Sequence, residues 1–179
     1  MATPTNLPAA FVSGAILTAA QQNSLRGAFR ILQVVTTSKS DTFTTTSTTY
    51  TDVTGLSVSI TPQSTTSKIF VVAGVSGTGE TGATNFFGRL MRDSTPIAVG
   101  DAASTRTQAS IFAPAQEAPS SMSVMFLDSP VTTSATTYKI QVKSQAATKT
   151  VYVNRGVSDT DFSTNPRTFS SITVFEISA

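Results

Sequence analysis

The chain has 179 residues, a formal net charge of +2, and no Cys, His or Trp. Charged residues make up 12%, and the basic residues are scattered singly, which argues against a nucleic-acid partner. The composition also excludes a disulfide scaffold, Ser-His-Asp catalysis and histidine zinc sites, and no apolar run is long enough to predict a membrane span.

The first thirty residues, 1–30, predict an extended arm followed by one short α-helix. Pro4 and Pro8 favour extended backbone, and Thr18 and Gln21 have the spacing of a capping box at a helix start. A helix of this length is marginal alone in water, so it needs a surface to pack on. The alternative to an external surface is packing on the chain's own β-domain or on its copies. The candidate anchoring residues are Leu7, Phe11, Ile16, Leu17, Leu25, Arg26, Phe29 and Arg30.

Residues 31–179 predict one all-β domain, an antiparallel β-sandwich of jelly-roll type. LSVSI (56–60) and TYKIQVK (137–143) alternate apolar and polar residues with period two, as half-buried strands do. KIFVVAGV, from Lys68, is a continuous apolar run and predicts a strand covered on both faces. Further candidate strands bring the total to about eight to ten. They are FRILQVV, TFTTTSTTYT, FFGRLMR, SMSVMFL, VYVNR and SSITVFEIS.

A long loop is expected between Asp101 and Ser120, around a short strand at 110–113. The segment consists of small residues and contains two prolines. Loops of this length inside a compact domain are often functional.

GTGETG contains the spacing G-x-G-x-x-G at Gly77, Gly79 and Gly82, directly after a predicted strand. A dinucleotide site needs a helix to begin within the motif, whereas the segment that follows is strand-like. The sequence therefore predicts a hairpin or loop here, and no cofactor is expected.

Asp159, Asp161, Ser163 and Asn165 alternate oxygen-bearing side chains, as a calcium loop does. The pattern departs from an EF-hand because Thr164 stands where that loop has its glycine. A solvated turn is the preferred interpretation, a calcium site is the alternative, and no metal is expected.

Enzymatic activity is not expected, because only carboxylate chemistry of the glycosidase type is left to this composition. Most of the acids fall at predicted turns, where Asp is a common turn former. A sugar-binding platform of Phe residues is a further alternative to their packing in the core. Its candidates are Phe86, Phe87, Phe112, Phe126, Phe162, Phe169 and Phe175.

The opening LPAAFVSGAILTAAQQNSLRGAF resembles the leader of many small phage structural proteins, including those of marine and cyanobacterial phages. The stretches TTTSTTYTDVTGLSVSITP, LMRDSTPIAVGDAA, LDSP and TTSATTYKIQV resemble the bodies of such proteins. The resemblance implies a location on the virion, an anchoring leader and a displayed β-sandwich, commonly as a trimer.

We therefore expect a head decoration or cement protein whose partner is the major capsid protein or another virion protein. A tail-fibre or adaptor protein that contacts the tail or the host surface is the alternative, with a host-surface glycan as a possible partner. A carbohydrate-binding or carboxylate-based glycan-active domain is the third possibility. No nucleic acid and no membrane partner is expected.

Overall fold

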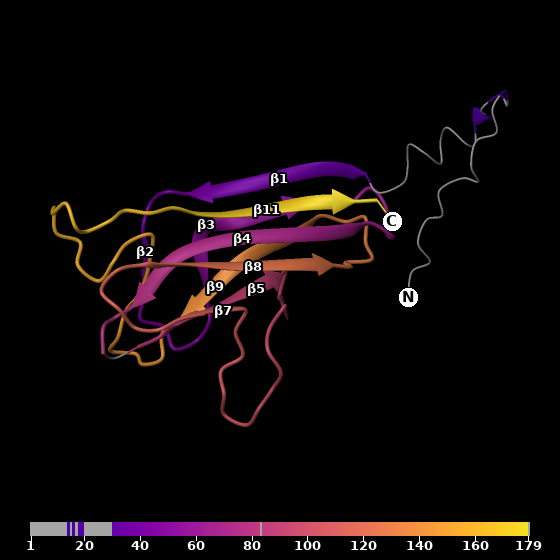
Figure 1. The fold of residues 1–179 in the computed structure, drawn as a ribbon. Helices are drawn as coiled ribbons and strands as arrows, with labels where there is room; N and C mark the ends of the chain where they lie inside the picture. The colour runs from indigo at the N-terminus through magenta and orange to yellow at the C-terminus, as the bar shows by residue number, and fades with distance from the viewer. Residues whose placement is uncertain (1–13, 15, 17, 20–29, 83, 179) are drawn as a thin grey trace.

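The computed structural model describes residues 14, 16, 18, 19, 30–82 and 84–178, and within them the structure is built from antiparallel strands (Figure 1). The all-β prediction is confirmed for this part of the chain. The predicted arm and helix lie, for the most part, outside the described residues. The strands are β1 (Ile31–Lys39), β2 (Phe43–Thr45), β3 (Thr51–Ile60), β4 (Lys68–Gly79), β5 (Phe86–Arg92), β6 (Thr95–Ile97), β7 (Ile111–Ala113), β8 (Ser120–Asp128), β9 (Thr136–Lys143), β10 (Val151–Val153) and β11 (Ser170–Ile177).

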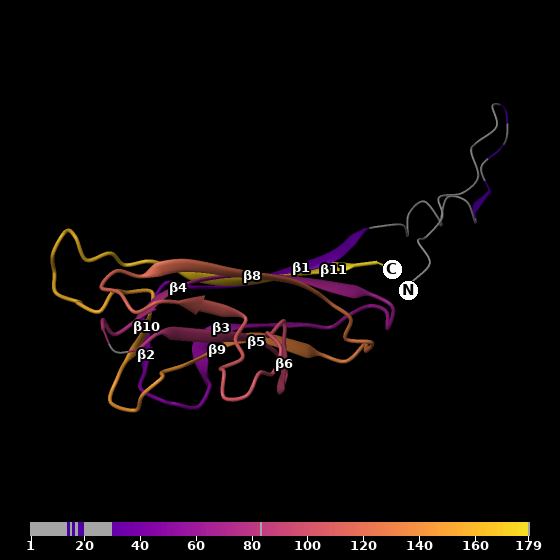
Figure 2. The ribbon, with the colours of Figure 1, turned by 60° about the horizontal axis from the view of Figure 1, so that its bottom comes forward.

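The strands form two sheets that lie face to face, as the two layers in Figure 2 show. In sheet A, β11 and β10 pair one after the other with the same side of β4, and β8 pairs with its other side. β1 and β2 pair with β11 and β10 in turn. Sheet A thus has four strand positions across, namely β1/β2, β11/β10, β4 and β8. Sheet B also has four, namely β3, β9, β5 and β6/β7.

The inner faces of both sheets supply one hydrophobic core. Leu56 and Ile60 of β3 are at most 2% exposed, and Tyr138 and Ile140 of β9 are fully buried. The half-buried strands predicted from LSVSI and TYKIQVK are therefore confirmed. The expected strand near residue 110 is β7, and it lies within the predicted loop.

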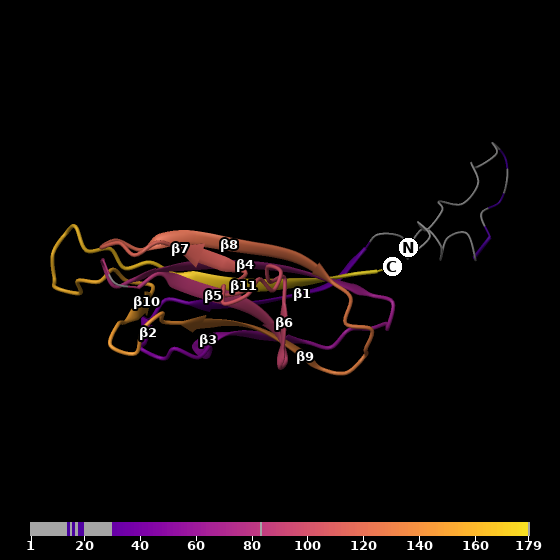
Figure 3. The ribbon, with the colours of Figure 1, turned by 90° about the horizontal axis from the view of Figure 1, so that it is seen from below.

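The prediction that KIFVVAGV is covered on both faces is wrong for the single chain. β4 alternates along its first half: Ile69, Val71 and Ala73 are buried in the core, while Phe70 and Val72 are only half-buried. The reason is that no layer of the described structure packs on the outer side of sheet A (Figure 3).

A buried carboxylate of sheet A is hydrogen-bonded to two side chains of sheet B. Asp128 of β8 is 5% exposed and accepts hydrogen bonds from the Tyr138 hydroxyl at 2.6 Å and from Arg92 Nη1 at 2.8 Å. Burial, followed by the hydrogen bond to Asp128, raises the pKa of Tyr138 far above its usual value. Tyr138 therefore remains a neutral donor, and the Arg92 guanidinium balances the Asp128 charge.

Candidate attachment end and outer surfaces

The N-terminal segment joins the domain beside the end of the last strand. The Arg30 N–H donates to Ser178 Oγ at 2.9 Å, and the Ser178 N–H donates to the Arg30 carbonyl at 2.9 Å. In Figure 1 this end lies on the right, where β1 begins and β11 finishes, and the loop 154–169 lies at the opposite end. The domain thus has an attachment end and a far end.

Of the eight predicted anchoring residues, the structure describes Ile16, which is 92% exposed, and Arg30, which is also exposed. The structure places Arg30 at the attachment end. The other six lie outside the described residues: Leu7, Phe11, Leu17, Leu25, Arg26 and Phe29.

A buried carboxylate fixes the attachment end, and sequence reasoning missed its role. Glu176 of β11 is fully buried. Its Oε2 accepts from Gln33 Nε2 at 2.6 Å, and its Oε1 accepts from the Gln63 N–H at 2.7 Å. Gln33 Nε2 also donates to the Thr61 carbonyl at 2.7 Å. One carboxylate therefore ties β11 to β1 and to the β3–β4 turn. The sequence signal that could have revealed this role is an acid at a position of an alternating strand that the pattern predicts to be buried.

Burial alone would raise the pKa of Glu176, but the Ser67 hydroxyl, the Gln33 amide and the N–H groups of Gln63 and Ser64 outweigh it and lower the pKa below its ordinary value of 4.5. A carboxylate with a lowered pKa in the folded state stabilises the fold fully above its unfolded pKa. That stabilisation is lost as the pH falls through the lowered value.

Glu176→Gln is therefore expected to lower the free energy of unfolding at pH 7 by about 1–3 kcal/mol, because charge-assisted hydrogen bonds are lost. The deficit should shrink as the pH falls from 4.5 through the lowered pKa, because the carboxylate of wild type is protonated first in the unfolded state and then in the folded state. Urea unfolding at pH 7 and at lower pH measures both effects, with Asp101→Asn, an exposed loop acid, as control. A deficit that is constant with pH contradicts this account.

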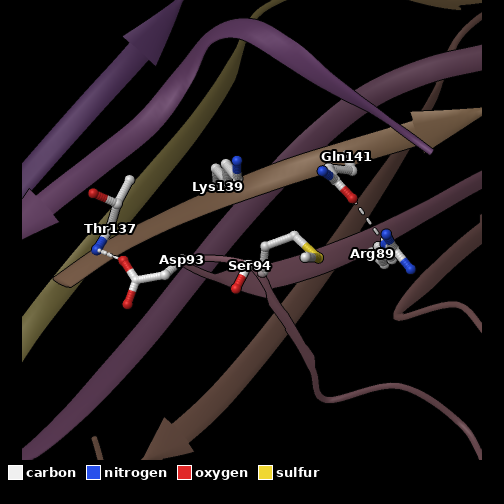
Figure 4. Close-up of a pocket in the computed structure, with 7 residues that line it drawn as sticks. Arg89, Asp93, Ser94, Thr137, Lys139 and Gln141 are labelled. Atoms are coloured by element: carbon white, nitrogen blue, oxygen red, sulfur yellow. Dashed lines mark hydrogen bonds between the residues drawn. The ribbon is translucent and has the colours of Figure 1, made fainter.

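A hollow lies on the outer face of sheet B, between β5 and β9 (Figure 4). Its volume is about 520 Å³. Asp93 Oδ1 at one end accepts from the Thr137 N–H at 2.9 Å. The hollow is lined by Arg89, Met91, Asp93, Ser94, Thr137, Lys139 and Gln141.

The two cations of this hollow have contacts with neighbouring side chains. Arg89 Nε donates to Gln141 Oε1 at 2.9 Å, and the Arg89 guanidinium lies 4.1 Å from the ring centre of Tyr50. Lys139 Nζ pairs with Asp52 Oδ2 at 2.7 Å. Lys139 is thus paired with a carboxylate and Arg89 is held by neutral groups, so the hollow is a polar stretch of the outer surface with hydrogen-bonding side chains.

The GTGETG segment is the end of a strand followed by a turn that leads into the other sheet, so the predicted hairpin is wrong and the loop is confined to the turn after Gly79. Gly77 and Gly79 belong to β4 and pair with β10, and β5 follows within a few residues. Both glycines are required by close packing. A Cβ at Gly77 would lie 2.5 Å from the Tyr152 carbonyl oxygen, and one at Gly79 would overlap the Thr84 carbonyl.

Gly79→Ala is expected to destabilise the domain by about 3 kcal/mol, because the new methyl group meets backbone that cannot rotate away. Gly100→Ala is the matched control, since a Cβ there has no neighbour within 4 Å. Thermal unfolding of the two variants should show a large loss for Gly79→Ala alone. Equal melting temperatures would show that the close approach carries no energetic weight.

The loop 154–169 does not hold Asp159 free for a cation. Its carboxylate pairs with Arg167 Nη2 at 2.6 Å and with Arg155 Nη1 at 3.1 Å. Asn165 Nδ2 donates to the Thr160 carbonyl at 3.0 Å, which closes a turn. Among the residues that the structure describes, no cluster of three acidic side chains could hold a metal ion. The geometry of the loop is that of the preferred solvated turn.

The predicted Phe platform is not assembled on one surface. Phe86 is fully buried in the core. Phe87 and Phe112 form a tilted pair, 5.5 Å between ring centres, on sheet B. Phe175 packs with Phe70 on sheet A, and Phe162 lies in the loop 154–169.

Comparison with known proteins gives no relative: no family model matches the chain, and no curated protein matches it significantly. Within the described part of the chain, no helix has the length and apolar character needed to cross a membrane.

Proposed function

We propose that this chain is a non-enzymatic structural protein of a phage particle, a decoration or cement protein on the head. Its N-terminal segment docks on the major capsid protein or on another virion protein, and the β-domain is displayed outward. The observation that carries the proposal is that the two ends of the domain differ. The N-terminal segment joins it at one end, through the paired backbone of Arg30 and Ser178, and the longest loop lies at the other.

The strand connectivity supports a jelly-roll sandwich. Numbered in chain order with collinear strands merged, the positions run 1-8-3-6 across sheet A and 2-7-4-5 across sheet B. This is the order of a double Greek key, an architecture that viral capsid proteins and lectins share. The architecture alone does not define a function, so the proposal rests on the attachment end and on the leader.

The anchor in this proposal is residues 1–30. Its apolar residues contact the shell, and Arg26 and Arg30 pair with acidic groups there. The protein acts as a homo-oligomer, with three copies favoured. Several linked anchors bind more tightly than one, because each further contact is intramolecular. The anchor contacts are Leu7, Phe11, Ile16, Leu17, Leu25, Arg26, Phe29 and Arg30.

A tail-fibre or adaptor protein that touches a host-surface glycan is the second candidate. Phe162 favours it, because this side chain is 67% exposed in the loop at the far end. Exposed aromatic rings are typical contacts at recognition surfaces.

The test is binding of the purified full chain to phage heads that lack this component, to isolated tails and to host cells, followed by electron microscopy. The proposal predicts regular extra density on heads, with the β-domain outward. Binding to tails or to host cells without binding to heads would move the protein to the second candidate. Binding to none of them would overturn both.

A further inference from the structure

One row of apolar side chains crosses the whole outer face of sheet A, and the adjacent row is apolar on β4 and β8 and carries threonines on β1 and β11. The register of the four strands aligns these rows: Val34–Phe175–Phe70–Leu127 and Thr36–Thr173–Val72–Met125. Val34 and Leu127 are each 53% exposed and Met125 is 64% exposed. The ring centres of Phe70 and Phe175 are 6.2 Å apart, so the middle of the face is aromatic.

This face differs in charge from the outer face of sheet B. The latter carries Arg89, Lys139 and Asp52 in the paired arrangement described above. On the outer face of sheet A, Lys68 at the rim is the one charged side chain that the register of the described strands places there, and its Nζ donates to Ser129 Oγ at 2.8 Å. The next row is small and polar, with Gly74 between Ser171 and Ser123.

Strands that are apolar on both faces normally have both faces covered. β4 and β8 have this composition, yet the core covers only the inner side of each. The mismatch between the composition and the burial of these strands indicates that a further layer packs on sheet A.

We propose that the outer face of sheet A is the contact between copies of this chain. This inference specifies the contact of the homo-oligomer in the proposed function. It rests on the protein being an oligomer and not on its binding to heads. A second copy suits a face with almost no charge, because neighbouring copies can then pack on it without like-charge repulsion. A partner recognised by charge would find almost nothing to complement on this face.

The face is large enough to form the central part of such a contact. Strands about 4.8 Å apart, and β4 from Lys68 to Gly74 at about 3.3 Å per residue, give roughly 19 Å by 23 Å, or about 440 Å². This is within the roughly 300–600 Å² of functional apolar patches and about half of the ~800 Å² that each partner buries in a standard interface. Phe169, 66% exposed, extends the face beside a hollow of about 180 Å³ next to Gly74.

The contact also has a consequence for attachment. Ile31, 57% exposed, pairs with Ile177 at the end of the same face, one residue after Arg30. Copies that meet through this face around an axis parallel to the strands place their attachment ends on the same side of the assembly. The N-terminal segments then leave together, as a multivalent anchor requires.

The test is the mass of the full chain in solution, measured by light scattering and analytical ultracentrifugation at several concentrations. Wild type is expected to be an oligomer. Met125→Asp and Leu127→Asp together should raise its dissociation constant by about 100-fold or more, because two charges per copy would be buried in an apolar contact. The matched control is Phe162→Asp, which changes an equally exposed side chain at the far end and should leave the mass unchanged.

A second measurement uses substitutions that do not place a charge in the proposed contact. The chain has no Cys, so Met125→Cys and Phe162→Cys each introduce a single thiol. In the oligomer the thiol at position 125 should react with a maleimide at least about tenfold more slowly than the thiol at 162, and dilution to the monomer should remove the difference.

The outcomes separate this inference from the proposed function. A monomeric wild type overturns the inference and the oligomer together, and leaves head binding to be tested alone. An oligomer that the double variant leaves intact overturns the sheet A contact only. A monomer in which position 125 is protected, and becomes reactive when residues 1–29 are removed, would assign the face to the chain's own N-terminal segment.

Discussion

Deletion of residues 172–179 is expected to abolish folding and to leave the protein insoluble. β11 lies between β1 and β4, so the deletion removes most of an inner strand of sheet A. Ile172 and Val174 are fully buried, and full burial of such side chains contributes about 1.5–3 kcal/mol each. Glu176, with its hydrogen bonds to Gln33 and Gln63, is lost as well. The sum is comparable with the whole stability of a small domain, about 5–15 kcal/mol.

The deletion also exposes backbone. β4 would lose its hydrogen-bonded neighbour along Lys68–Ala73, and β1 would lose most of the strand that holds it. An unpaired apolar strand is a template for aggregation. The soluble fraction after expression and the far-ultraviolet circular dichroism measure the effect, with deletion of Ala179 alone as control. A soluble truncated protein with a cooperative melt would contradict the central position of β11.

Deletion of residues 1–29 is expected to have the opposite profile: the fold is retained and attachment is lost. Among the described residues, the buried side chains of the core come from Val53 onward, and β1 contributes the partly buried Val35, which packs against them. Arg30 and its hydrogen bonds with Ser178 are kept in this truncation. We therefore expect a melting temperature within about 4 °C of the full chain at equal oligomer concentration, which corresponds to less than ~1 kcal/mol.

The matched control for this deletion replaces residues 1–29 with a Gly/Ser segment of equal length, which keeps the chain length and removes the apolar contacts. Both proteins should melt alike and both should fail to bind particles. If the truncated protein unfolds, the N-terminal segment belongs to the core. If the Gly/Ser chimera still binds particles, the anchor lies elsewhere.

Local sequence pattern predicted most strands, because period-two alternation reports which face is buried. Leu56, Val58 and Ile60 are an example, each at most 3% exposed between exposed serines. The pattern failed for KIFVVAGV. A continuous apolar run predicts cover on both faces but does not say whether the same chain provides it. In β4 the chain provides it for Ile69 and Val71 and not for Phe70 and Val72.

Local sequence patterns could not predict contacts between residues that are distant in sequence. Lys39 pairs with Ser170, and Asn154 at φ +63° donates from Nδ2 to the Lys39 carbonyl at 2.8 Å, where the loop 154–169 interrupts sheet A. Nothing near residue 39 or residue 154 indicates this partnership. The hydrogen bonds of Glu176 have the same character, since Gln33 lies in β1 and Gln63 in the β3–β4 turn, both far from residue 176 in sequence.

The candidate site, too, was predicted only in part from the sequence. The leader indicated an anchoring segment, and the structure adds the place where that segment meets the domain, at Arg30 and Ser178. The anchor contacts stay a prediction, because Leu7, Phe11, Leu17, Leu25, Arg26 and Phe29 lie outside the described residues. The outer face of sheet A was not predicted, because it is defined by the register of four strands and not by any one segment.

The most direct measurement of the central claim is side-by-side binding of the full chain and of the chain lacking residues 1–29 to phage heads stripped of this component, followed by electron microscopy. The account predicts that the full chain alone decorates the shell, with the end that carries Arg30 and Ser178 facing the head. Equal decoration by both proteins, or binding of the full chain to tails or host cells but not to heads, would contradict it.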